Sequence, residues 1–276
     1  MNLTYYLRGH LVNTYVSLLD MMPNALLQQN AIFKNVHRGQ RLFILGSGNS
    51  IKVQDMKLLE GEIVMTQNHF HAHQDIAVIN PTYHVNVPKF HPKEYDKDWE
   101  IWFDTMEERL PAHCTFFWGI NTKEMIDRRQ TLNKRSYYVD PQYNPNCLSK
   151  AHADITKIIM RVPTVLTQCL SIAIYMGFKE IYLVGMDLNQ SCIIQDNRDE
   201  VRFYGNSPIT SNQAEKNAEI HLMDTGIEWF NQWAIWKQLN LLNVAAKENQ
   251  VQILNATRGG LLNMFPRVNY ENLLKK

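Results

Sequence analysis

The chain has 276 residues, of which 45% are hydrophobic, enough for one large domain with a sizeable core. Its 28 basic and 27 acidic residues give a formal net charge of +1 at pH 7, so no long-range field favours nucleic acid as a partner. The 4 cysteines lack CxxC spacing and indicate neither a zinc knuckle nor a disulfide framework, which fits a reducing cytoplasm. No apolar run reaches the roughly 18 residues of a spanning helix and no signal-type segment opens the chain, so we expect a soluble or peripheral protein.

Residues 1–38 are expected to form a helical arm. Apolar residues recur there at helical spacing up to Pro23, and a second apolar stripe covers residues 25–33. Such helices can pack on the domain, pair with another subunit or lie on a membrane surface. Packing within the chain is the simplest of the three. The sequence thus leaves open a homo-oligomer and a peripheral association with the inner face of the membrane.

The most distinctive stretch is RLFILGSGNS, residues 41–50, in which four apolar residues run directly into Gly46, Ser47, Gly48, Asn49 and Ser50. This pattern predicts a buried strand that ends in a tight polar loop. Glycines let the backbone approach a ligand, and successive N–H groups in such a turn, or at the start of the next helix, bind anions. The third glycine of a dinucleotide fingerprint is absent, and the loop is not a Walker motif. An ordinary strand-to-helix turn therefore explains it equally well.

Short apolar runs alternate with helical stretches along the rest of the chain. Further strands are expected at residues 62–66, 83–87, 114–118, 180–185 and 251–254, a short helix over 51–59, the clearest helix over 161–177 and a long helical region over 214–249. This alternation predicts a mainly parallel sheet covered on both faces, within one α/β domain over residues 39–276. Ligands of such sheets bind at the carboxyl ends of strands, where the Gly46 loop, Asn68 and the end of 83–87 would meet.

Two polar stretches interrupt the pattern. Residues 121–150 lose periodicity and gather basic residues, tyrosines and prolines, so we interpret them as a lid over an anionic or sugar-like ligand, with a solvated surface as the alternative. Residues 189–213 form a second polar loop, and we expect both stretches to serve as lid or acceptor loops. The second loop follows Asp187, an acidic residue at the end of a buried strand, a position that is often functional.

Five segments, in chain order, resemble one known group of enzymes. They are FKNVHRGQRLFILGSGNSI, DMKLLEGEIVMTQNHF, NPTYHVNV, MGFKEIYLVGMDL and NATRGGLLNMFPRVNYENLL. Together they are similar to the bacterial family-42 sialyltransferases and to a related family of unknown-function proteins that includes the motility-associated nonulosonate transferases. The resemblance covers about residues 33–274. It implies a single Rossmann-like domain of the GT-A type whose lid closes over a CMP-activated nonulosonic acid.

The resemblance also implies roles for single residues. The glycine loop matches at residues 46–50, with Ser47 in place of the asparagine that meets the donor phosphate. Asn68 would touch the nucleotide or donor sugar, and Asn86 matches a further asparagine loosely, one position out of register. Thr164 stands for the serine at a helix start that contacts the donor carboxylate, and Arg161, assigned here as catalytic, lies just upstream.

The resemblance also implies which residues contact the leaving phosphate and which residue acts as the base. Gly185, Asp187 and Asn189 fall in the segment that carries the family's phosphate-holding tyrosines; one tyrosine is missing, and Tyr204 stands in for the other. His221 matches the catalytic histidine and would act as general base on the acceptor hydroxyl, because an unperturbed imidazole titrates near neutrality. The implied reaction is an inverting, metal-independent transfer to a surface glycan or glycoconjugate, with the CMP-sugar as co-substrate and no cofactor.

Three other interpretations stay open. His69, His71 and His73 follow a strand, as metal-binding histidines do in hydrolases, but no second histidine pair accompanies them. The pair Asp96 and Asp98 is formally a DxD motif, although it lies in a charged segment that favours a solvated face. The third interpretation is a nucleotide-binding protein that is non-catalytic or of different specificity, such as one similar to the related pterin diphosphokinases.

Overall fold

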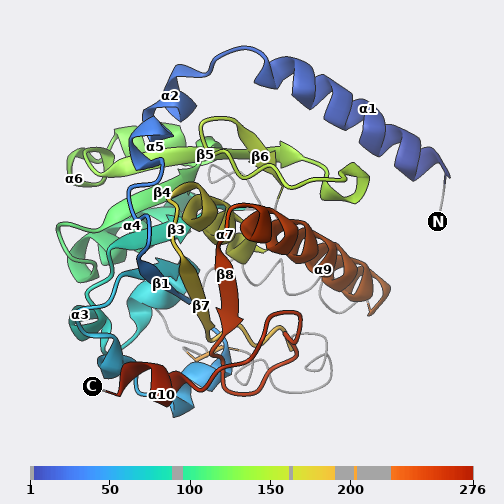
Figure 1. Ribbon diagram of the computed structural model, residues 1–276. Coiled ribbons are helices and arrows are strands. Elements are labelled where there is room, and N and C mark those ends of the chain that lie inside the picture. The colour runs from blue at the N-terminus through green and yellow to red at the C-terminus, as the bar shows by residue number, and fades with distance from the viewer. Residues whose placement is uncertain (1–2, 89–95, 162–163, 190–201, 204–224, 276) are drawn as a thin grey trace.

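The computed structural model describes residues 3–88, 96–161, 164–189, 202–203 and 225–275. Its centre is a sheet of eight strands in the order β6-β5-β4-β3-β2-β1-β7-β8 (Figure 1). All paired neighbours run parallel, which confirms the predicted α/β fold with a parallel sheet. The strands are β1 (Arg41–Leu45), β2 (Val64–Gln67), β3 (Tyr83–Asn86), β4 (Thr115–Gly119), β5 (Ser136–Tyr143), β6 (Ile158–Met160), β7 (Glu180–Val184) and β8 (Gln252–Asn255).

The strands are apolar at successive positions because both faces of the sheet are covered. In β1, Leu42 and Ile44 face one hydrophobic core, and Phe43 and Leu45 face the other. All four side chains are 0% exposed. Alternating side chains of one strand thus enter two separate cores, as expected for a parallel sheet between helical layers.

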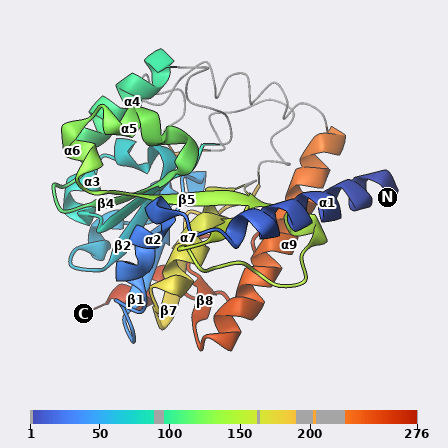
Figure 2. The ribbon, with the colours of Figure 1, turned by 90° about the horizontal axis from the view of Figure 1, so that it is seen from above.

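One core lies under two helices and the other under many short ones (Figure 2). The first is covered by α7 (Val165–Tyr175) and α9 (Thr225–Glu248). The second is covered by η2 (Asn49–Val53), η3 (Met56–Leu59), α3 (Ile76–Ile79), α4 (Asp96–Arg109), α5 (Lys123–Asp127), α6 (Gln130–Asn133) and α10 (Tyr270–Leu274). The single helix expected over 51–59 is therefore two short 3₁₀ segments, η2 and η3.

The strand order places the reversal of the sheet beside β1. From β1 the chain adds β2 to β6 in one direction, and α7 then carries it back so that β7 pairs with the other side of β1. A crevice forms outside the carboxyl ends of the strands at such a switch point. In this sheet it lies over the ends of β1 and β7.

The expectation of a long irregular loop over residues 121–150 was wrong. That segment contains η6 (Ile120–Thr122), α5, α6, the whole of β5 and η7 (Pro145–Cys147). Strand β5 is hard to recognise because it carries Asp140 and Pro141 and divides its pairing. Its first half pairs with β4, and its second half pairs with β6 across an irregular register near Pro141. The other expected loop, 189–213, lies outside the described residues except for 189 and 202–203.

The N-terminal segment contains α1 (Leu3–Asp20), α2 (Ala25–Gln28) and η1 (Gln29–Phe33). Helix α1 extends along the side of the molecule and contacts β5 and η7 (Figures 1 and 2). Phe33 of η1 is buried in the core beside α7. Among the described residues, no helix combines the length and apolarity that crossing a bilayer requires.

Candidate functional site

Most of the residues predicted for donor binding lie along the carboxyl edge of the sheet. Gly185 follows β7, Gly46 follows β1, Asn68 follows β2, and Asn86 is the last residue of β3. These four strands are consecutive neighbours in the sheet, so the loops after them are adjacent. The structure thus brings together residues that are up to 139 positions apart in the sequence, from Gly46 to Gly185.

Backbone hydrogen bonds lock the Gly46 loop to the end of β7. Gly46 N–H donates to the Val184 carbonyl at 2.8 Å, and Gly48 N–H donates to the Gly185 carbonyl at 2.9 Å. A Cβ on Gly46 would lie 2.5 Å from the Gly185 oxygen, so only glycine fits there. The glycines allow two loop backbones to meet at the switch point.

Asp187 closes the same loop from the other side. Its carboxylate accepts a 2.9 Å hydrogen bond from Ser50 N–H and a second, short one from the Ser50 hydroxyl. A Cβ on Gly48 would lie 2.5 Å from the carboxyl carbon of Asp187. The amides of Gly46, Gly48 and Ser50 are therefore all used within the protein. The expectation that these N–H groups form an open phosphate cradle was wrong for these three residues.

Two amide side chains at the edge do have unused hydrogen-bonding atoms. Asn86 is 4% exposed, and its Nδ2 has no partner among the described residues. The Oδ1 of Asn49, in the Gly46 loop, is also buried and without a described partner. A buried polar group without a partner costs roughly 1–3 kcal/mol. A ligand that hydrogen-bonds to these atoms would remove that cost, so they mark a place where ligand binding is favourable.

The amino end of α7 is the third component of the edge. Thr164 is its N-cap residue, and its hydroxyl makes no capping bond within the helix. Helix α7 packs on β2 and β3, so its positive end lies near the carboxyl ends of these strands. Three buried side chains, those of Cys169, Gln67 and Met186, connect α7 with the ends of β2 and β7. The Cys169 thiol donates weakly to Gln67 Oε1 at 3.5 Å, and Gln67 Nε2 donates to the Met186 sulfur at 3.4 Å.

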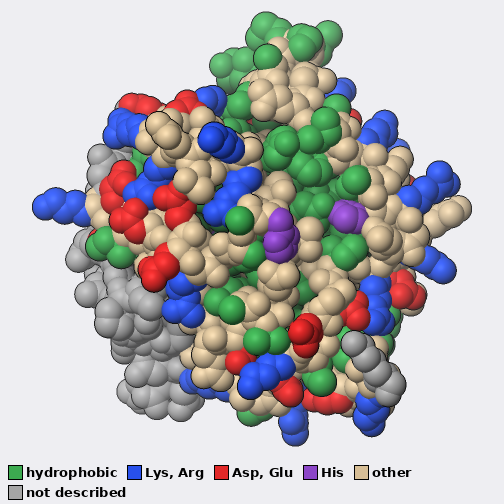
Figure 3. Space-filling view, turned by 90° about the vertical axis from the view of Figure 1, so that its left-hand side faces the viewer, with side chains coloured by type: hydrophobic (Ala, Val, Ile, Leu, Met, Phe, Trp, Pro, Cys, Tyr) green, Lys and Arg blue, Asp and Glu red, His purple; other side chains and the backbone are tan. Residues whose placement is uncertain are grey.

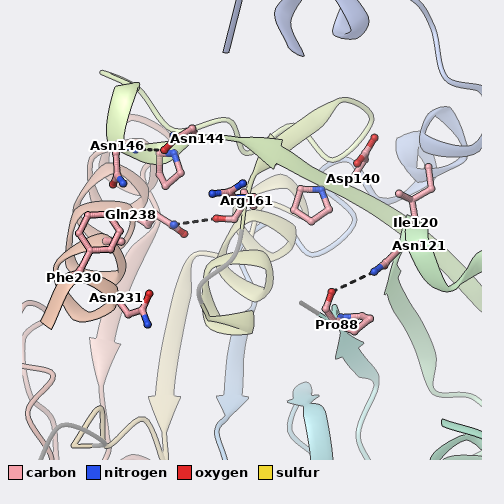
Figure 4. Close-up of a pocket in the computed structure, with 13 residues that line it drawn as sticks. Pro88, Ile120, Asn121, Asp140, Asn144, Asn146, Arg161, Phe230, Asn231 and Gln238 are labelled. Carbon is pink, nitrogen blue, oxygen red and sulfur yellow. Dashed lines mark hydrogen bonds between the residues drawn. The ribbon is translucent and has the colours of Figure 1, made fainter. Parts of the chain in front are cut away.

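Arg161 leads from β6 towards α7. Its backbone N–H donates to the Tyr143 carbonyl at 2.8 Å, and its carbonyl accepts from Gln238 Nε2 at 3.0 Å. The main chain is thus fixed from two sides. The guanidinium makes no hydrogen bond or ion pair with the described residues and lines the neighbouring pocket, where it is available to an anion (Figure 4).

That pocket extends the edge from the end of β3 to α9 and has a volume of about 530 Å³ (Figure 4). Its wall is rich in amides and holds one exposed aromatic ring, that of Phe230. Gln238, at 0% exposure, contributes an Oε1 atom that has no partner among the described residues. The lining residues are Pro88, Ile120, Asn121, Asp140, Pro141, Asn144, Pro145, Asn146, Arg161, Phe230, Asn231, Ala234 and Gln238.

The sequence interpretation anticipated part of this pocket, because Arg161 and the lining residues between 121 and 146 fall within its catalytic and lid predictions. It missed the wall that α9 forms. Gln238 and Phe230 give no local signal, since each lies within the long helix α9 and approaches the edge only through tertiary packing. Of the remaining predicted residues, Asn189 is half-buried after β7. His221 and Tyr204 lie outside the described residues.

The histidines after β2 form part of the core. His69 packs edge-on against Trp102, His71 lies near His84, and His73 stacks on Phe70. Burial, followed by the charge of His69, lowers the pKa of His71 to about 3, and burial lowers the pKa of His84 well below its ordinary value. The rings thus point at different neighbours, and no group of three metal-ligating side chains is present in the described part of the chain. Asp96 and Asp98 lie in the first turn of α4 instead of at a strand end.

The parallel sheet and its polar carboxyl edge define a Rossmann-like α/β fold. No protein-family model matches the chain, and no curated protein matches it in sequence. Among solved structures it is similar to the sialyltransferase CstII from Campylobacter jejuni, determined in complex with the substrate analogue CMP-3FNeuAc. The two are 15% identical over 86% of this chain and 89% of CstII, with a TM-score of 0.52. The monofunctional α-2,3-sialyltransferase Cst-I from the same organism is 17% identical over 83% of this chain and 80% of its own, with a TM-score of 0.47. The likeness to CstII confirms the expected sialyltransferase-like fold.

Proposed function

We propose that the protein is a glycosyltransferase that moves a sialic or other nonulosonic acid from a CMP-activated donor to a glycan acceptor. The observation that carries this proposal is a pair of amide side chains at the carboxyl edge, Asn49 and Asn86, each with a buried atom that has no partner among the described residues. A CMP-sugar supplies hydroxyl, phosphate and carboxylate groups, which suit amide donors, amide acceptors and a helix N-terminus. CstII, which shares the fold, was solved with such a donor analogue.

The donor and acceptor would occupy neighbouring parts of the edge. We assign the nucleotide to the loops after β1, β2, β3 and β7 and the acceptor sugar to the pocket between β4 and α9. Amide side chains suit sugar hydroxyls, and the ring of Phe230 offers an apolar surface to a sugar face. This division leaves the anomeric carbon between Thr164 and Arg161, where the two parts meet.

The chemistry follows from the charges that develop in such a transfer. The transition state is oxocarbenium-like and releases a phosphate, so the enzyme must stabilise the departing negative charge and accept the acceptor proton. The guanidinium of Arg161 has no hydrogen-bond or ion-pair partner among the described residues and is the group proposed to stabilise the phosphate. His221, predicted from the resemblance, is the proposed base. A single displacement would invert the anomeric centre.

A thermal-shift panel of nucleotides and nucleotide sugars tests donor binding. CMP and CMP-sialic acid should raise the unfolding midpoint by mass action, and UDP- and GDP-sugars should not. Equal shifts with all nucleotides, or no shift with cytidine nucleotides, would refute the proposal. His221→Ala should then lower turnover by about 10²–10⁴-fold at nearly unchanged donor affinity, the range typical of general-base catalysis.

The second candidate is a nucleotide-binding protein without transferase activity or with another donor, such as a pterin diphosphokinase-like enzyme. Ser47 in the glycine loop and the internal use of three loop amides favour it, because both reduce the groups available to a phosphate. CMP binding without release of CMP from CMP-sugars, in the presence of a mixed glycan acceptor library, would support this candidate.

A further inference from the structure

Helix α1 is held against the domain by one face. Gly9 approaches Cys147 so closely that a Cβ would overlap the Cys147 sulfur. Asn13 exchanges two hydrogen bonds with the backbone of Asn144, at 2.7 and 3.0 Å. Val16 is buried with Tyr143 and Ile158. These contacts recur every three or four residues along one side of the helix, so α1 is a fixed ridge of the molecule.

The opposite face of α1 is apolar and exposed. Hydrophobic side chains gather at the top of the molecule in Figure 3, the side on which α1 and α2 lie in Figure 1. We call Leu7, Leu11, Tyr15, Leu18 and Met22 the α1 stripe. They are 56%, 70%, 61%, 59% and 63% exposed. Their spacing of four, four, three and four residues is that of the seam between two packed helices.

The charges beside the α1 stripe decide which partner suits it. Between Leu7 and Met22 the only charged side chains are Arg8 and Asp20, with one histidine, His10. Asp20 accepts a 2.8 Å hydrogen bond from Ile158 N–H, so it belongs to the docked face. Helices that lie on anionic membranes carry several Lys or Arg residues beside the apolar face. A protein partner therefore fits this surface better than a lipid headgroup layer.

From these observations we propose that the α1 stripe is a dimer interface between two copies of this chain. A two-fold axis places the same patch on both partners, so a seam with heptad-like spacing is complementary to itself. Together with the exposed Val12 and Met21, the stripe exposes roughly 800 Å² before association, which is an upper limit on the area that it can bury and is comparable with the ~800 Å² per partner of a standard interface. Both copies keep their docked α1 faces, so dimerisation needs no rearrangement.

Analytical ultracentrifugation of the full chain tests the proposal. The wild-type protein should sediment as a dimer at micromolar concentration, and Leu11→Glu with Leu18→Glu should raise the dissociation constant at least about 100-fold, because two charges per copy would enter an apolar seam. Val53→Glu is the matched control, since Val53 is 57% exposed and lies in η2, outside the stripe. Both variants should melt like the wild type.

Three results would overturn the dimer. The first is a wild-type monomer at all concentrations, and the second is an unchanged dimer in the double variant. The third is co-sedimentation of the wild type, but not the double variant, with vesicles of neutral or anionic phospholipid, which would make a membrane the occupant. None of these measurements depends on the proposed transferase activity.

Discussion

Three asparagines, Asn30, Asn49 and Asn86, each keep one buried amide atom without a partner among the described residues, but they differ in how the rest of the amide is used. Asn30 donates to the carbonyls of Tyr138 and Ile155, each at 2.7 Å, and thereby joins η1 to the sheet. Asn86 Nδ2 and Asn49 Oδ1, at the carboxyl edge, make no hydrogen bond with the described residues. The first pattern is that of a structural residue, and the second is that of a residue whose partner arrives with the ligand.

This contrast predicts opposite effects for one substitution. Asn86→Ala should lower affinity for CMP by about 10-fold or more and cost less than about 1 kcal/mol of stability, because no described hydrogen bond of Nδ2 is lost. Asn30→Ala should destabilise by about 2–3 kcal/mol and leave the affinity of the folded fraction unchanged. Calorimetric titration and urea unfolding on both variants measure the two effects. A strongly destabilised Asn86→Ala protein that binds CMP normally would contradict this prediction.

The contact between Gly48 and Asp187 yields a second prediction at this scale. In Gly48→Ala the new methyl group would displace the carboxylate that holds Ser50, because the ideal Cβ lies only 2.7 Å from both carboxylate oxygens. Stability should fall by about 1–3 kcal/mol, and CMP binding should be lost as the loop shifts. Asp187→Asn separates the causes, since it keeps the volume, removes the charge and replaces one acceptor oxygen by an NH2 group that can donate to the Ser50 hydroxyl. Its CMP affinity should remain within a few-fold of the wild type.

At the scale of the elements, neutral imidazoles are buried where η4 (Asn68–Ala72) packs against β3 and α4. The folded protein holds the pKa of His71 at about 3, mainly through burial, so the unfolded chain binds more protons between that value and the ordinary pKa near 6.5. Stability is therefore complete above about pH 6.5 and declines as the pH falls through this window.

For His71 alone, the decline from pH 7 to pH 5 should be about 2 kcal/mol. Urea unfolding at the two pH values measures it. His71→Gln should flatten the pH dependence, whereas the same change at the exposed His113 should not. An equal slope in all three proteins would show that His71 does not carry the effect.

The anchor of α1 also reaches the pocket, because Asn144 both bonds to Asn13 and lines the cavity. Asn13→Ala should cost about 1–3 kcal/mol and speed amide exchange across residues 144–148, with acceptor KM raised and donor affinity unchanged. Thr14→Ala is the control, since its exposed hydroxyl donates to the His10 carbonyl of the same helix and has no other partner among the described residues. Unchanged exchange at 144–148 would exclude this coupling.

At the scale of the whole molecule, the sequence predicted six of the eight strands and one side of the pocket, and it missed β5, β6 and the wall that α9 forms. Buried strands such as β1 and β7 are runs of apolar residues, so local pattern and global position agree. Strand β5 lacks the apolar pattern of a buried strand because it contains Asp140 and Pro141. These residues lie where the pairing of β5 changes from β4 to β6. Gln238 and Arg161 meet only through the packing of α9 on α7 and η7, and no local signal encodes that meeting.

The proposed chemistry predicts that the whole enzyme works without a divalent metal. We assign the stabilisation of the negative charge on the departing phosphate to Arg161 and to the amino end of α7. Transfer should therefore persist in EDTA. Coupled assays of CMP release before and after chelation measure this. Activity that is lost in EDTA and restored by Mn²⁺ or Zn²⁺ would contradict this prediction and would favour a metal site at Asp96 and Asp98 or at the histidines.

The docking of α1 has a consequence for biosynthesis. Its anchors join Asn13 to Asn144 and Asp20 to Ile158, across 131 and 138 residues of chain. A ribosome that adds roughly 5–20 residues per second needs roughly 7–28 s to supply β5 and β6 after α1 has been translated. During that interval both faces of α1 lack their native partners. Nascent chains that end before residue 140 should therefore recruit chaperones through α1, and chains that extend past β6 should bury its anchoring face.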